Sequence, residues 1–284
     1  MQHLIYSSID VYSRIRDAFQ DSIEACREID ADFASFSGVQ MSYYSSRCQS
    51  VNLLLQEWKL WDCDILMRSA LECATRFLFV CIAPQPERGQ RIIEYTVSLN
   101  EIEDIQRSEK ARIAARNAGD SESAMLFGGA ALSAEDEARI RNKWPKPCRQ
   151  SLKQKWSFSE IVRVLEKVKE PTLDLTNYGS LLHSYGLSSH LIHADQTAMD
   201  LMYDRATRTA EERQLQERAH FARLAVEQTS MFFLCWRAME HAIGGPKAQK
   251  ELVEGLLSLY EESNKYHHEF AMSQKHMYEA NSRD

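Results

Sequence analysis

Residues 64–82 of this chain, DILMRSALECATRFLFVCI, have the pattern of a single buried helix. Apolar residues recur at steps of three and four, as they do on a helical face that packs into a protein core. Arg68, Glu72 and Arg76 stand in the same stretch, each one helical turn from the next. We call Arg68, Glu72 and Arg76 the Arg68 ladder. Because an unpaired buried charge is very costly, the sequence predicts a core helix on which this ladder needs partners from elsewhere in the chain.

The remainder of the chain also favours helices. Only 10 glycines and 6 prolines interrupt its 284 residues, and no stretch shows the alternating pattern of a strand. We therefore expect an all-α fold, a bundle of about seven to nine helices that forms a single domain over residues 1–284. Its core is expected at about residues 40–243, with an N-terminal helix at 1–29 and a C-terminal helix at 247–278 packed on it or used for assembly.

Turn and cap residues suggest where individual helices begin and end. The polar stretch 30–38, which closes on a glycine, is expected to separate the first helix from the second. Asp62 or Asp64 is a candidate N-cap for the buried helix, and residues 119–129 are expected to form a mobile loop. A capping box and a Gly-Gly-Pro stop predict that the longest helix covers residues 209–243.

Charge and cysteine content restrict the classes of function. A net charge of −7 argues against a protein that coats nucleic acid through overall basicity, but residues 143–156 are basic and carry two tryptophans that can stack on bases. Seven cysteines without a CxxC pair predict reduced thiols in a cytoplasmic protein. The longest apolar run, 77–83, is much shorter than the roughly 20 residues that span a bilayer, so no membrane partner is expected.

A later stretch, residues 178–195 (YGSLLHSYGLSSHLIHAD), supplies the partners that the buried ladder needs. Ser189 and His193 are one turn apart and therefore share a helical face. An Arg, a Glu, a Ser and a His that converge in a helix bundle can bind a phosphate and support acid–base chemistry on it. We expect His193 within about 8 Å of the ladder, close enough for one bridging water. The predicted catalytic residues are Arg68, Glu72, Ser189 and His193, and the predicted ligand-binding residues are Arg76, Tyr185 and His190.

The same side chains have a second interpretation. They can form a satisfied polar network whose only role is to hold two helices in register. The sequence leaves these two interpretations open.

Two other groups of histidines suggest weaker hypotheses. Residues 183–195 contain three histidines and an aspartate, but a di-iron bundle needs two Glu-x-x-His motifs, and only Glu217 with His220 has that spacing. No metal or cofactor is therefore expected. Arg213 and His220 have the Arg-x4-6-His spacing of HEPN ribonucleases, although the same pair also suits a solvated helical face.

Three segments together resemble a bacterial family of helical proteins, the domain of unknown function number 5677. The segments are MRSALECATRFLFV, KWPKPCRQSL and YGLSSHLIHAD, and the resemblance covers roughly residues 40–240. It implies a helical fold distantly similar to HEPN domains, which are common in toxins and phage-defence systems, and it implies no settled activity. The Arg-Asn-x-x-x-His form of HEPN nucleases is absent. The residues that fit the pattern are Arg68, Glu72, Trp144, Pro145, Tyr185, Ser189 and His193.

Two functions from different classes follow as expectations. The first is a metal-independent endoribonuclease, or a related phosphodiester-cleaving effector of toxin or phage-defence type. In this enzyme His193 is the general acid–base, Arg68 holds the phosphate, and Glu72 orients either His193 or Arg68. The second is a non-catalytic helical module that binds a nucleotide or a protein through the same pocket. The expected partners are RNA or a nucleotide, a cognate protein, and a second copy of the chain, because HEPN-like folds often place their clefts at a two-fold interface.

Overall fold

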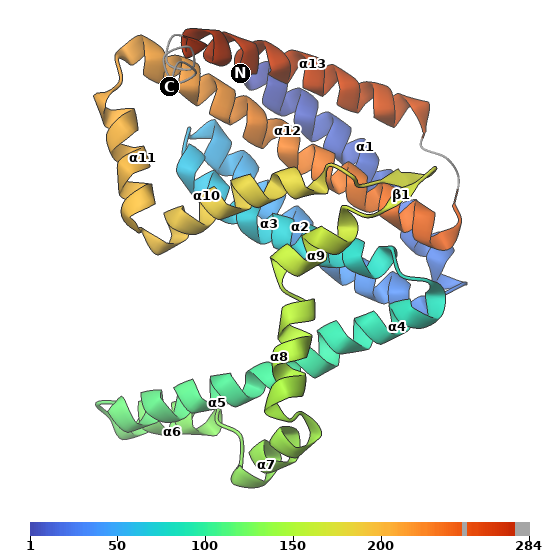
Figure 1. The fold of residues 1–284 in the computed structure, drawn as a ribbon, viewed down its shortest axis with the longest axis vertical. Helices are drawn as coiled ribbons and strands as arrows, with labels where there is room; N and C mark the ends of the chain where they lie inside the picture. The colour runs from blue at the N-terminus through green and yellow to red at the C-terminus, as the bar shows by residue number, and fades with distance from the viewer. Residues whose placement is uncertain (246–248, 276–284) are drawn as a thin grey trace, which may run out of the picture. The chain divides into compact units, whose positions relative to one another are not determined.

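The computed structural model describes residues 1–245 and 249–275 of the chain. Figure 1 shows that helices make up almost all of this part, which confirms the all-α prediction. The only strands among the described residues are β1 (Lys169–Glu170) and β2 (Leu173–Asp174), which pair antiparallel. The helices are numbered α1 to α13, which exceeds the predicted seven to nine. None of the helices described is long and apolar enough to cross a membrane.

The chain divides into two compact units, residues 1–84 with 162–284 and residues 85–161. Helix α9 (Phe158–Leu165) crosses the boundary between them. The helices of the first unit are α1 (Gln2–Arg27), α2 (Ala31–Gln56), α3 (Leu60–Cys81), the 3₁₀ helix η2 (Tyr178–Ser180), α10 (Leu181–His193), α11 (Gln196–Thr207), α12 (Ala210–Ile243) and α13 (Lys250–Ser273). Those of the second are α4 (Gln85–Ile93), the π-helical turn η1 (Glu94–Ser98), α5 (Leu99–Asn117), α6 (Ser121–Gly129), α7 (Ala134–Lys143) and α8 (Lys146–Lys155).

Helix α12 is the central element of the first unit. It packs against α1, α3 and α13, and Figure 1 shows it running beside α1 and α13. The predicted capping box at its start is present, with Thr209 and Glu212 each accepting from the other's backbone N–H. At its end Gly244 has φ +67°, a left-handed conformation that favours glycine. Both predicted ends of the longest helix are therefore confirmed.

The apolar side chains of α12 are used inside this unit. Phe232 and Trp236 are 1% and 2% exposed, and the Phe232 ring stacks on Phe19 of α1 and Tyr44 of α2, each with 5.6 Å between ring centroids. Phe77 of α3 lies 5.8 Å from Phe19 in the same core. These aromatic side chains of α12 therefore pack inside the first unit.

Several predicted boundaries were wrong. Helix α2 begins at Ala31, capped by the Asp30 side chain, so Gly38 lies inside a helix, where a glycine costs only about 1 kcal/mol. Residues 119–129 contain helix α6, capped by Asp120, instead of a loop. The predicted C-terminal helix 247–278 corresponds to α13, and residues 246–248 and 276–284 lie outside the described residues.

Both tryptophans of the basic stretch, and the lysine before each of them, contact carboxylates within the second unit. The Trp144 indole donates to Glu101 at 2.7 Å, and the Trp156 indole donates to Glu94 at 3.0 Å. The lysine that precedes each tryptophan pairs with the same carboxylate at 2.7 Å, and Trp156 is only 3% exposed. These indoles serve internal contacts, so the expectation that they stack on nucleic-acid bases loses its basis.

Candidate functional site

The predicted ladder on α3 is formed. Glu72 lies between the two arginines, with Arg68 Nε at 3.4 Å from Oε1 and Arg76 Nη2 at 3.1 Å from Oε2. The three side chains are 17% to 29% exposed, so they are partly buried. The ladder is thus a mostly satisfied charge group at the edge of the core.

Tyr185 of α10 is the distant partner that the ladder was predicted to need. Its hydroxyl donates to Glu72 Oε1 at 2.7 Å and accepts from Arg68 Nη2 at 2.9 Å. The Arg68 guanidinium also lies over the Tyr185 ring, 4.3 Å from its centroid. Burial, followed by the hydrogen bond to Glu72, raises the pKa of Tyr185. The sequence therefore identified this contact correctly across more than a hundred residues.

Ser189 and His193 do not join the ladder. Tyr178 bonds Thr75 at 2.7 Å while Tyr185 bonds Arg68 and Glu72, so α10 runs antiparallel to α3. His193 lies two turns beyond Tyr185, about 12 Å further along the helix. It is exposed and forms no hydrogen bond or ion pair with α3 among the contacts of the described residues. Among the described contacts, the hydrogen bonds to Arg68 and Glu72 that were expected of His193 are made by Tyr185.

His190 is engaged at the turn into α11. Its Nδ1 lies 2.6 Å from Asp195 Oδ2, and both side chains are 43% exposed. Asp195 also caps α11 by accepting from the Ala198 backbone, and the His190 contact is the main cause of its lowered pKa. Within the described residues, no three His, Cys, Asp or Glu side chains are grouped so that they could hold a metal ion.

A second charged group on α3 was not predicted. Asp64 is 2% exposed and receives His220 Nε2 of α12 at 2.7 Å. Arg223, one turn further along α12, contacts the other oxygen of Asp64 and donates to Glu227 at 2.6 Å. We call these four residues the Asp64 cluster. The His220 ring also packs edge-on against Trp61, 5.2 Å between centroids.

The electrostatics of the Asp64 cluster show how the buried charges are paired. Burial alone would raise the pKa of Asp64, but the hydrogen bond from His220 and the positive charge of Arg223 outweigh it and lower that pKa. Burial likewise opposes the charge of Arg223, and the carboxylates of Glu227 and Asp64 outweigh it and raise its pKa. The buried Asp64 carboxylate and the partly exposed Arg223 guanidinium thus keep each other ionised.

The sequence contained part of the signal for this cluster. His220 had been paired with Arg213, which is exposed at the start of α12, whereas its neighbour in the structure is Arg223. Asp64 had been interpreted as a helix cap, but α3 begins at Leu60 and Asp64 lies in its second turn. The steps of three and four from His220 to Arg223 and Glu227 place all three on one helical face, which was the available clue.

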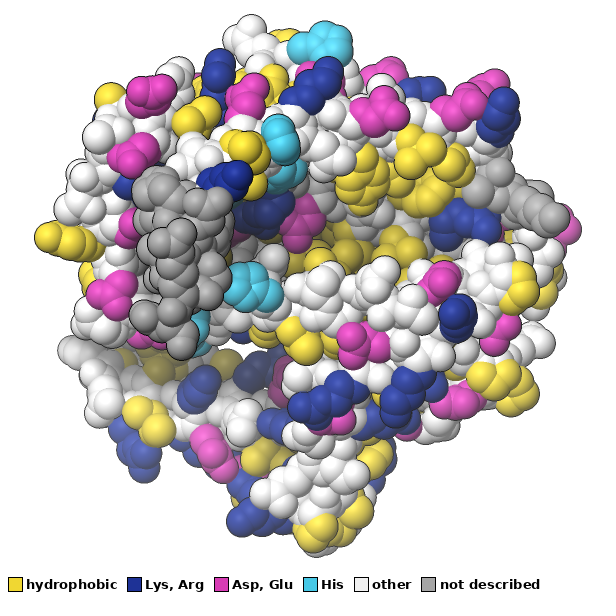
Figure 2. Space-filling model, turned by 45° about the horizontal axis from the view of Figure 1, so that its top comes forward, with side chains coloured by type: hydrophobic (Ala, Val, Ile, Leu, Met, Phe, Trp, Pro, Cys, Tyr) yellow, Lys and Arg dark blue, Asp and Glu magenta, His cyan; other side chains and the backbone are white. Residues whose placement is uncertain are grey.

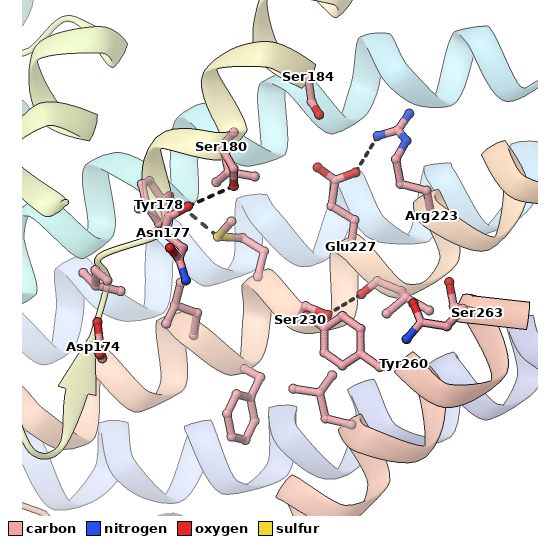
Figure 3. A pocket seen from close by; sticks show the side chains of 18 of the residues that line it. Asp174, Asn177, Tyr178, Ser180, Ser184, Arg223, Glu227, Ser230, Tyr260 and Ser263 are labelled. Atoms are coloured by element: carbon pink, nitrogen blue, oxygen red, sulfur yellow. Dashed lines mark hydrogen bonds and ion pairs between the residues drawn. The ribbon is translucent and has the colours of Figure 1, made fainter. Parts of the chain in front are cut away.

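Arg223 and Glu227 also line a cavity of about 700 Å³ between η2, α10, α12 and α13. Figure 2 shows a hollow with hydrophobic side chains on its floor and basic, acidic and histidine side chains beside it. In Figure 3 the Arg223–Glu227 pair lies between Ser184 on one side and Tyr260 and Ser263 on the other. The apolar residues that line the cavity are Leu175, Leu181, Val226, Met231, Phe233, Leu234 and Leu256.

His267 of α13 completes one polar edge of this cavity. Its Nε2 lies 3.1 Å from the Ser263 hydroxyl. Burial, followed by the positive charge of Arg223, lowers the pKa of His267 below its ordinary value of 6.5. His267 is therefore neutral at pH 7. Among the described residues that line the cavity, Arg223 is the one permanent cation, and it is paired with Glu227, while the Asp174 carboxylate lies at the other end of the lining in Figure 3.

Comparison with known proteins defines the family. Residues 41–209, more than half of the chain, match the family described as "Family of unknown function (DUF5677)". The chain belongs to DUF5677. No curated protein and no solved structure matches it. The DUF5677 segment contains the Arg68 ladder, Tyr185 and Asp64, but it stops at Thr209, the N-cap of α12. The partners of Asp64 and half of the cavity wall thus lie beyond the family segment.

Proposed function

We propose that this chain is a helical ligand-binding module that holds one nucleoside-sized organic molecule in the cavity between α10, α12 and α13. The observation that supports this proposal is the cavity itself, about 700 Å³ with an apolar floor and polar groups at its edges. Pockets of roughly 300–1,000 Å³ with this mixture of surfaces are typical of small-molecule sites. The apolar floor supplies affinity, and the polar groups orient the ligand.

The Asp64 cluster gives this site a fixed polar wall. Arg223 is held from behind by Asp64 and from the side by Glu227, so its guanidinium cannot rotate without breaking a buried ion pair. A pre-positioned wall lowers the ordering cost that a ligand must overcome on binding.

A cavity-filling variant tests the proposal. Calorimetric titration with adenosine, guanosine, cytidine and uridine, and with their 5′-monophosphates, would measure binding to the full chain. Ser184→Trp places an indole in the cavity and should abolish the binding. Thr197→Trp is the matched control, because Thr197 is exposed on α11 and does not line the cavity. Equal binding by both variants would place the ligand elsewhere.

A second candidate function is metal-independent cleavage of a phosphodiester in RNA, as expected from the sequence but moved from His193 to His220. The Asp64–His220 contact favours it, because a buried carboxylate on Nε2 orients the imidazole and leaves Nδ1 for proton transfer. His220 would take the proton of a ribose 2′-hydroxyl. The distant resemblance to HEPN domains supports this candidate by fold-level analogy only. Cleavage ranks second to ligand binding because the carboxylates of Asp64 and Glu227 both contact the Arg223 guanidinium. Their negative charge weakens the attraction of Arg223 for a phosphate.

Cleavage is tested with labelled RNA in the presence of EDTA. The second candidate predicts EDTA-resistant cleavage that His220→Ala removes and His193→Ala retains. The His193 variant is a matched control because that histidine is exposed and has no contact with the Asp64 cluster among the described residues. Intact RNA with the unmodified protein would leave ligand binding as the function.

A further inference from the structure

Two serine hydroxyls that line the cavity already donate their hydrogen bonds to backbone carbonyls. Ser180 Oγ donates to the Asn177 carbonyl at 2.9 Å, and Ser230 Oγ donates to the Val226 carbonyl at 2.8 Å. Figure 3 shows the two serines on opposite sides of the cavity wall. Because a hydroxyl has one proton and two acceptor lone pairs, both side chains face a ligand as acceptors.

Thr176, at the rim of the cavity, also presents its hydroxyl to a ligand as an acceptor. Its Oγ1 donates to Asp174 Oδ1 at 2.8 Å, so this hydroxyl also offers only lone pairs. The Asp174 carboxylate beside it accepts hydrogen bonds and cannot donate any when ionised. The rim therefore adds acceptors to those of the wall.

The charged groups add to this excess of acceptors. Arg223 uses two of its five N–H groups on carboxylates, one on Asp64 and one on Glu227, so two negative charges are paired with its one positive charge. Glu227 uses Oε2 for that contact, and its Oε1 has no hydrogen bond among the contacts of the described residues. Figure 3 shows the second oxygen of Glu227 directed away from Arg223. The charged groups around Arg223 therefore carry a net negative charge and leave one carboxylate oxygen of Glu227 for a ligand.

The remaining polar groups of the lining do not change this excess of hydrogen-bond acceptors. Ser184, Tyr260 and the two asparagine amides, Asn177 and Asn264, can donate, but they can accept as well. His267 is neutral at pH 7 because its pKa is lowered. Within the described lining, no cation is left that is not already paired with a carboxylate.

We infer that the ligand of this cavity presents N–H donors and carries no negative charge, so that it is a neutral or cationic amino compound docked on Glu227 and not a phosphate ester. This inference rests on the proposed function. A phosphate would meet the Glu227 carboxylate and the acceptor hydroxyls, and like charge and unmatched acceptors both oppose binding. An ammonium or aromatic amino group forms a charge-assisted or ordinary hydrogen bond with the same oxygens.

Two matched probe pairs test this inference on the full chain by titration calorimetry. Tyramine and 3-(4-hydroxyphenyl)propionate share a phenol ring and differ in the sign of their charge. Adenosine and adenosine 5′-monophosphate share a nucleoside and differ by a phosphate. The inference predicts that tyramine binds at least about tenfold more tightly than the acid, and adenosine more tightly than its phosphate, since a hydrogen bond to a charged group contributes about one tenfold step or more.

Variants assign the preference to Glu227. Glu227→Gln should reduce the tyramine-over-acid preference by about tenfold, and Glu254→Gln, at an exposed position of α13 outside the cavity, should leave it unchanged. Circular dichroism and a melting curve establish that each variant is folded. The comparison of probes on the unmodified protein does not depend on any variant.

The outcomes separate the inference from the proposed function. Equal or tighter binding of the two anionic probes, abolished by Ser184→Trp, would overturn the inference and support the cavity as a binding site. Binding of none of the four probes at millimolar concentration would overturn the proposed function and the inference with it. Binding of the amino probes that survives Ser184→Trp would place their site outside the cavity and overturn both.

Discussion

Helix α3 carries two charged groups that differ in the burial of their central carboxylate and in where its partners come from. In the Arg68 ladder the three charges stand on one helix, one turn apart, and are 17% to 29% exposed. In the Asp64 cluster the carboxylate is 3% exposed and its two partners come from α12, 156 and 159 residues away in sequence. The ladder is a local arrangement that water partly screens, whereas the Asp64 cluster exists only when α3 and α12 are packed together.

This difference predicts different energetic roles. Partly exposed pairs on one helix contribute little, because solvent screens them and side-chain entropy opposes them. A buried carboxylate that loses its partners, or partners that lose their carboxylate, leaves uncompensated charge in the core. The Asp64 cluster should therefore be the group on which the packing of α3 against α12 depends.

The largest effect is expected for Asp64→Ala. This change removes the buried acceptor of His220 and leaves Arg223, whose side chain is 31% exposed, with Glu227 as its remaining partner. The free energy of unfolding should therefore fall by about 3 kcal/mol, the lower end of the cost of breaking a buried pair. Urea unfolding followed by circular dichroism measures it. The matched control is Asp62→Ala, two residues earlier on α3 and exposed, which should change little. Similar losses for the two variants would contradict the buried-cluster interpretation.

Acid should remove the contribution of Asp64 selectively. Because its folded pKa lies below the ordinary value of 3.8, its contribution to stability is complete above that value and is lost as pH falls through the lower folded pKa. The difference in unfolding free energy between the unmodified chain and Asp64→Ala should thus stay constant from about pH 7 to pH 5 and narrow below pH 3.8. Urea unfolding at a series of pH values measures this difference. A constant difference down to about pH 2 would mean that folding does not lower the pKa of Asp64, and a difference that grows as pH falls would mean that its folded pKa is raised.

A smaller effect is expected for Glu72→Gln. Removing this charge weakens its contacts with Arg68 and Arg76, and the amide still accepts from the Tyr185 hydroxyl. Since these side chains are partly exposed, the loss should be about 1–2 kcal/mol, which is less than full burial of the ladder would have implied. The same urea measurement applies. A loss as large as that of Asp64→Ala would erase the contrast between the two groups.

The sequence predicted what depends on local periodicity and failed where packing selects partners. The helical pattern of residues 64–82 and the caps at Thr209 and Gly244 follow from spacing and side-chain chemistry, and the structure contains them. Tyr185 was predicted to meet the ladder because few other segments carried hydroxyls on an apolar helical face.

Asp64 shows the limit of sequence reasoning. An aspartate near a helix start satisfies the rule for a cap, and its true role depends on α12, which contacts it through residues far along the chain. Gly38 and helix α6 show the same limit for helix boundaries. Glycines suggest a break in the helix in both places, but packing and an aspartate cap can keep a glycine inside a helix. The cavity could not be predicted, because it is formed by side chains of β2, η2, α10, α12 and α13 and of the residues between β2 and η2.

The smallest effect is expected for His193→Ala, which changes the residue predicted from the sequence to be the general acid–base. His193 is exposed in the last turn of α10, where its loss removes only a weak interaction with the helix dipole. The free energy of unfolding should change by no more than about 0.5 kcal/mol. His220→Ala, by contrast, leaves the buried Asp64 short of one hydrogen bond and should cost about 1–3 kcal/mol. Parallel urea titrations of the two histidine variants measure both values. A larger loss at His193 than at His220 would reverse the assignment of the functional histidine, because it would require His193 to be packed against a charged partner.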